Sequence, residues 1–166
     1  MDIGYSAQVV ALLATVISFI AFLYYLRRRQ EESIYNFSRT AIIVQVIMLT
    51  VAIAILMRYF LIRDFNVEYV ANYSDRSLAL IYTISGVWAG ASGSLLLWAW
   101  ILSLFIMAVS FRERKDKITG YALTILLSVN IFFISLLLTI SNPFQRLSFT
   151  PEDGGGLGIL PMVLGH

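Results

Sequence analysis

Long uncharged runs divided by short charged clusters dominate the chain. The first runs from Ile3 to Leu26, and at about 1.5 Å per residue its 24 residues can cross a bilayer core. The second extends from Thr40 to Met57 and continues past Arg58 to Ile62. Arg58 lies about one turn from the end of this run, where a long side chain reaches the headgroups. These two runs predict the first two transmembrane helices.

The third uncharged run, residues 77–111, is too long for one straight span. Its 35 residues would form a helix of roughly 50 Å, whereas the hydrocarbon core is about 30 Å thick. The stretch GVWAGASGSLLLWAW, residues 86–100, contains three glycines, which favour a break there. We therefore expect an interfacial or re-entrant segment from about Ser77 to Trp88, and then a span over residues 94–111.

The last uncharged run, residues 118–140, is followed by Asn142-Pro143, which stops a helix because proline disfavours helical geometry in the residue before it. The predicted fold class is an all-α integral membrane protein with four transmembrane helices and an interfacial or re-entrant segment before the third. The expected spans are residues 3–26, 40–62, 94–111 and 118–140. They belong to a membrane module over residues 1–147, and residues 148–166 are expected to form an external C-terminal tail.

Composition agrees with a membrane protein and limits its chemistry. Hydrophobic residues make up 59% of the 166 positions, and charged residues only 13%, which is outside the range of soluble domains. The absence of cysteine excludes disulfides, thiolate metal sites, CxxC redox chemistry and covalent attachment of haem to this chain. The sequence also lacks a Ser-His-Asp set, a carboxylate pair within a span and a phosphate loop. We therefore predict no catalytic residue and no metal site.

The basic residues predict how the protein lies in the membrane. No Lys or Arg precedes the first span, and four lie between the first and second spans. Three lie within residues 58–76, four lie between the third and fourth spans, and one follows the fourth. The two richest loops belong in the cytoplasm, so both termini lie outside a plasma (inner) membrane, in the periplasm or the extracellular space. Residues 63–93 and the segment after residue 141 then share the outer face. Basic loops beside spans indicate topology, so we predict no nucleic-acid partner and expect membrane lipid around the chain.

The glycine-containing stretch offers a surface for close packing. Gly86, Gly90, Gly93 and Ser94 are spaced by one to four residues, and on a continuous helix they would lie on one face. Such small-xxx-small pairs let a second backbone approach closely, which is how membrane helices commonly pack.

Tryptophans and buried amides are the remaining candidate features of the spans. Trp88 fits an aromatic belt at the membrane interface, whereas Trp98 and Trp100 lie about one to two turns into the span and could instead form a stacking wall for a flat apolar ligand. Gln45 and Asn130 are expected to make interhelical hydrogen bonds rather than an ion pathway. His166 is the single imidazole of the chain, and a terminal histidine is ordinarily exposed and without a role.

Three sequence blocks together resemble the CcmF haem lyase family of cytochrome c maturation. DFNVEYVA, residues 64–71, and VWAGASGSLLLW, residues 87–98, are similar to that family's D-F-S-V-x-Y-V-A and V-W-G-G-H-E-G-S-L-L-L-W. SNPFQRL, residues 141–147, resembles its T-S-N-P-F-x-R-L, and PEDGGGL resembles the P-x-D-G-x-G-L that follows. The resemblance spans the whole chain but only the N-terminal part of the family.

The departures from the family are informative. The family's His and Glu are Ala91 and Ser92 here, and Thr83 stands where the family usually has Lys. The tryptophan-rich WWD segment that cups haem is absent, and so are the histidines that flank it. The resemblance therefore implies either the N-terminal subunit of a split family member, completed by a WWD-bearing partner, or a truncated member. We favour the split subunit.

The resemblance implies a subunit that helps to position haem and apocytochrome c on the outer face for thioether attachment. Such a chain would be at most a non-catalytic or partial subunit of a haem lyase, and it would bind haem together with its partner chain. His166 lies at about the position of a family histidine that ligates haem, and Trp88 and Trp98 would wall the haem or the partner. Further partners would be the haem chaperone and thiol-handling subunits. The alternatives are a structural or assembly subunit of a respiratory complex without haem, and a small transporter, which the lack of charges within the spans disfavours.

Overall fold

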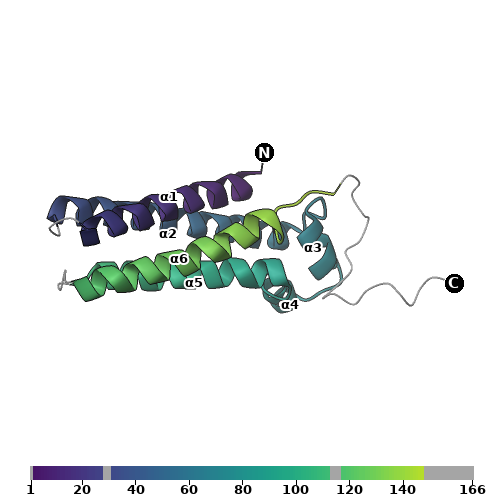
Figure 1. Ribbon diagram of the computed structural model, residues 1–166. Coiled ribbons are helices and arrows are strands. Elements are labelled where there is room, and N and C mark those ends of the chain that lie inside the picture. Colours follow the sequence, from purple (N-terminus) through teal and green to yellow (C-terminus); the bar gives the residue numbers. More distant parts are fainter. Residues whose placement is uncertain (1, 28–30, 113–116, 148–166) are drawn as a thin grey trace.

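Four long antiparallel helices form the body of the molecule (Figure 1). The computed structural model describes residues 2–27, 31–112 and 117–147. The long helices are α1 (Ile3–Arg27), α2 (Glu32–Ile62), α5 (Ala91–Ser110) and α6 (Lys117–Thr139). Each is long and apolar enough to cross a membrane. The prediction of an all-helical membrane protein with four spanning helices is confirmed.

Two short helices, α3 (Glu68–Tyr73) and α4 (Leu80–Gly86), lie together at one end of the bundle (Figure 1). The long uncharged run breaks between α4 and α5, as predicted. Gly90 is the N-cap of α5 and has extended backbone geometry, with φ −106° and ψ 171°. The interfacial or re-entrant character of the segment before α5 stays a prediction.

Local signals explain where the helices begin and end. The Asp2 carboxylate accepts a 2.8 Å hydrogen bond from the Gly4 N–H, which is N-cap geometry for α1. Helix α2 ends at Ile62, and its C-cap Arg63 adopts the left-handed conformation with φ 54° and donates its N–H to the Phe60 carbonyl. Helix α6 ends just before Asn142-Pro143, where the sequence predicted its stop.

The interior of the bundle contains two separate clusters of buried apolar side chains. The cluster near α3 and α4 includes Leu56, Phe60 and Ile134, and the cluster at the opposite end is centred on Tyr25 and Tyr35. The rings of Tyr25 and Tyr35 meet edge to face with centroids 5.5 Å apart. Large apolar side chains also cover the outside of all four long helices, as lipid contact requires, for example Ile20, Phe37, Phe105 and Phe132.

Candidate functional site at the α3–α4 end

Segments far apart in the sequence meet at the end of the bundle that carries α3 and α4. We call this region the α3–α4 end; it consists of the start of α1, residues 63–93 and residues 141–147. A single antiparallel bridge joins Val67 to Arg146, and the Glu68 N–H donates to the Gln145 carbonyl at 2.9 Å. A Cβ on Gly4 would lie 2.2 Å from the Phe144 ring, so the start of α1 also packs closely against residues 141–147.

The hydroxyl of Tyr69 holds the turn between α4 and α5. It accepts a 3.0 Å hydrogen bond from the Gly90 N–H, and its own proton faces the carbonyls of Val87 at 3.2 Å and Gly90 at 3.3 Å. Burial raises the pKa of the Tyr69 hydroxyl, and its backbone contacts at Gly90 and Gly93 oppose part of this rise. The phenol therefore remains neutral and acts as a donor and an acceptor at once.

Glycines make this turn sterically feasible. A Cβ on Gly93 would lie 1.7 Å from the Val87 carbonyl oxygen and 2.5 Å from the Tyr69 hydroxyl. A Cβ on Gly90 would lie 2.5 Å from the Tyr73 ring, and one on Gly86 would lie 2.7 Å from the Tyr73 carbonyl oxygen. Glycine is required where backbone or a ring approaches this closely.

The four small residues that the sequence singled out do not share one face of one helix. Gly86 ends α4, Gly90 caps α5, and Gly93 and Ser94 lie in the first turn of α5. The Ser94 hydroxyl donates to the Trp88 carbonyl at 2.8 Å. These positions therefore contact α3 and the turn itself, because the break divides the stretch before a continuous small-residue face can form.

Both candidate wall residues are exposed. Trp88, in the turn before α5, has 42% of its surface exposed, and Trp98, more than two helical turns further along α5, has 61% exposed. Each indole is therefore accessible to lipid, a ligand or a partner. Their use as a wall for haem or a partner stays a prediction.

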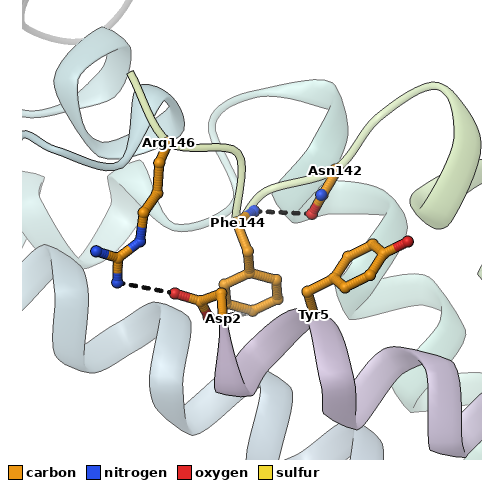
Figure 2. A pocket seen from close by; sticks show the side chains of 5 residues that line it. All are labelled: Asp2, Tyr5, Asn142, Phe144 and Arg146. Carbon is orange, nitrogen blue, oxygen red and sulfur yellow. Dashed lines mark hydrogen bonds and ion pairs between the residues drawn. The ribbon is translucent and has the colours of Figure 1, made fainter. Parts of the chain in front are cut away.

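An ion pair that the sequence analysis did not anticipate ties the start of α1 to residues 141–147. The Arg146 guanidinium donates to the Asp2 carboxylate at 3.1 Å, and the Tyr59 hydroxyl donates to the same carboxylate oxygen at 2.8 Å. Asp2 and Arg146 line a cavity of about 550 Å³ together with Tyr5, Asn142 and Phe144 (Figure 2). The one local signal was Asp2 immediately before a long apolar run, which is the pattern of an N-cap.

Arg63 organises the loop between α3 and α4 in a second way that the sequence did not reveal. Its guanidinium donates to the carbonyl oxygen of Leu78 at 2.7 Å and to that of Arg76. The left-handed backbone of Arg63 directs the chain out of α2, and its side chain then binds the loop that leads into α4.

Comparison with known proteins identifies the relatives of this chain. It matches no protein-family profile. It is 36% identical over 140 residues to the cytochrome c-type biogenesis protein CcmF of Pseudomonas aeruginosa, covering 82% of this chain and 21% of that protein. It is 35% identical over 118 residues to CcmF of Haemophilus influenzae, and this match covers 69% of this chain and 18% of that protein. The chain belongs to the CcmF family. The cytochrome c-type biogenesis protein CycK of Rhizobium meliloti is 30% identical to it over 159 residues, and this match covers 95% of this chain and 23% of CycK.

A solved structure shares the fold. The structure of "Cytochrome c Heme Lyase CcmF" superposes with a TM-score of 0.78 at 23% identity, over 87% of this chain and 24% of that one. This chain thus spans about a fifth of the length of the CcmF relatives that it matches.

The described residues meet only part of what haem binding requires. Exposed indoles can lie against a flat ring, but the chain's single imidazole, His166, lies outside the described residues. Among the residues that the structure describes, no three His, Asp or Glu side chains are grouped so that they could hold a metal ion. The α3–α4 end alone therefore does not supply a histidine ligand for haem iron.

Proposed function

We propose that this chain is a subunit of a cytochrome c assembly complex of the haem lyase type. In this proposal its α3–α4 end helps to position haem and apocytochrome c on the outer face of the membrane for thioether attachment. A partner chain that carries the WWD segment and its histidines would complete the haem site. The chain itself would position and support, and would supply no nucleophile.

The observation that carries the proposal is where the family-like blocks lie. Residues 64–71, 87–98 and 141–147 are separated in the sequence, yet the bridge at Val67 and the hydrogen bonds of Tyr69 join them at the α3–α4 end. Segments that meet at one end of a rigid bundle are a common place for binding residues, so the contact between these three blocks favours a shared working surface there.

The outward orientation rests on the distribution of basic residues. The connections between α1 and α2 and between α5 and α6, with the helix ends beside them, contain eight Lys and Arg, whereas the α3–α4 end together with Arg58 contains four. Positive charge beside spans favours the cytoplasmic side, so the α3–α4 end is proposed to face outward.

Cysteine labelling tests this orientation, and the cysteine-free sequence gives a clean background. Asn72→Cys on α3 and Ser33→Cys on α2 both replace exposed residues at opposite ends of the bundle. In intact cells, a membrane-impermeant maleimide should label the first variant and leave the second unlabelled. The reverse pattern would overturn the orientation.

Co-purification tests the haem part of the proposal. The full chain is expressed with and without a WWD-bearing CcmF-type partner, and the purified membranes are examined for a haem Soret band. We expect the two chains to co-purify, and the haem absorbance to require the partner and to fall in His166→Ala. A chain that neither associates with such a partner nor alters its haem content would refute the proposal.

A further inference from the structure

A layer of buried polar side chains separates the two apolar clusters of the bundle. On α1, α2, α5 and α6, polar residues lie between a member of one cluster and a member of the other along the sequence. The polar residues are Thr15 and Ser18 on α1, Gln45 on α2, Ser103 on α5 and Asn130 on α6, and all are 0% exposed. All four spanning helices therefore contribute to the division of the core.

The helix register places Gln45, Ser103 and Asn130 at similar depth. Two hydrogen bonds relate α2 to α5: Trp100 Nε1 to Thr50 Oγ1 at 2.9 Å and Tyr35 Oη to the Ser110 carbonyl at 3.0 Å. The two helices are antiparallel, so residue numbers rise along one as they fall along the other. Counted from either hydrogen bond at about 1.5 Å per residue, Gln45 and Ser103 lie within one helical turn of the same depth in the bundle.

The same reasoning connects the other two helices to the layer. The hydroxyls of Ser92 and Ser141 are 2.9 Å apart, and counting inward along α5 and α6 from this contact puts Ser103 level with Asn130. The Ser18 hydroxyl donates to the Ser38 carbonyl at 3.1 Å, and counting from this bond places Thr15 about one turn from the depth of Gln45 and Ser18 about two turns from it.

The two amides of the layer have unused hydrogen-bonding capacity. Among the described residues, neither the oxygen nor the nitrogen of the Gln45 and Asn130 side chains has a hydrogen-bond partner. The interhelical hydrogen bond that the sequence predicted for them is not formed. Each amide offers two donors and an accepting oxygen, and leaving these groups unpaired within a membrane-spanning bundle is costly.

The hydroxyls of Thr15 and Ser103 do not meet this need. Thr15 donates to the Ala11 carbonyl at 2.6 Å, and Ser103 donates to the Trp100 carbonyl at 2.6 Å. Because each hydroxyl already donates its proton to a carbonyl of its own helix, it can accept a hydrogen bond from an amide N–H but cannot donate one to an amide oxygen. The amide oxygens therefore need a further donor, and a water molecule supplies two.

We propose that this layer is an internal water-binding site, in which water bridges the side-chain amides of Gln45 and Asn130 in the middle of the bundle. Buried waters ordinarily make two to four hydrogen bonds to such polar groups. Bridging water would join α2 to α6 by directional bonds at the level where apolar packing is interrupted. The layer would thereby fix the register of the four helices, as buried polar residues do in coiled coils.

Magnetisation transfer from water tests the site directly. The full chain, labelled with ¹⁵N and reconstituted in nanodiscs, is examined by NMR for cross-relaxation between water and side-chain NH₂ groups. Gln45→Leu and Asn130→Leu serve to assign the two resonances. We expect long-lived water cross-peaks at both amides. Their absence, or a direct contact between the two NH₂ groups without water, would overturn the proposal.

A thermal unfolding cycle provides an independent readout. Each of Gln45→Leu and Asn130→Leu leaves the other amide without its bridge, so each should lower Tm by about 4 °C or more. The double variant should be no less stable than either single variant, because both polar partners are removed together. Asn36→Leu makes the same change at an exposed amide on α2 and should alter Tm by about 1 °C or less. Additive losses in the double variant would contradict a shared site.

Discussion

Replacing Gly93 with alanine tests how the turn before α5 is built. The added methyl group would lie 1.7 Å from the Val87 carbonyl oxygen and 2.5 Å from the Tyr69 hydroxyl. Neither neighbour is the free end of a flexible side chain, so the turn has to move away from α5. That movement separates the Tyr69 hydroxyl from Gly90 or Val87, whose hydrogen bonds hold the turn.

The size of the effect follows from three contributions. Forced overpacking costs about 1–3 kcal/mol, and a buried polar group that loses its partner costs a further ~1–3 kcal/mol. Alanine is the better helix former by about 1 kcal/mol, which offsets part of the loss. The net destabilisation is about 3 kcal/mol, which corresponds to a fall in Tm of about 6–12 °C for a chain of this size.

Gly120→Ala is the matched control for thermal unfolding in detergent micelles. Gly120 lies within α6, and its added Cβ would meet mainly the end of the Leu26 side chain, which can rotate away. This variant should be as stable as the wild type, or more stable by about 1 kcal/mol. If Gly93→Ala were equally stable, the close approach at Val87 would not constrain the fold.

Three further outcomes follow. Tyr69→Phe should cost about 1–3 kcal/mol in thermal unfolding, because the Gly90 N–H loses its acceptor. Since burial raises the pKa of Tyr69 in the folded state, wild-type stability should fall as pH rises above about 10, where the unfolded phenol ionises, and Tyr69→Phe should show a smaller fall. Asp2→Ala should cost about 2–3 kcal/mol and Asp2→Asn less, because asparagine keeps the N-cap and loses only the charge opposite Arg146; equal losses would contradict the capping role.

The number of spans and the position of the break could be predicted because run length and glycine content are local properties. Thirty-five uncharged residues exceed one bilayer crossing whatever surrounds them, and Gly86, Gly90 and Gly93 mark where the chain turns. The same reasoning did not reveal that Tyr69, on another helix, holds that turn. A tyrosine in a short polar segment has no pattern that identifies its partner.

Contacts between distant residues lay beyond local reasoning. Asp2 and Arg146 are 144 positions apart, and only the antiparallel packing of α1 and α6 brings them together. The buried amides show the opposite case. Their burial followed from their place in apolar runs, but the absence of a direct partner depends on the spacing of four helices, which periodicity does not encode.

Haem attachment to a reporter apocytochrome c tests the central proposal most directly. The assay uses membranes that contain the WWD-bearing partner and lack this chain, with covalent haem detected on the reporter after denaturing electrophoresis. We predict that the wild-type chain and Gly120→Ala restore haem attachment, whereas Gly93→Ala, which disturbs the α3–α4 end, restores much less. Equal haem attachment with and without the chain would contradict a role in cytochrome c assembly.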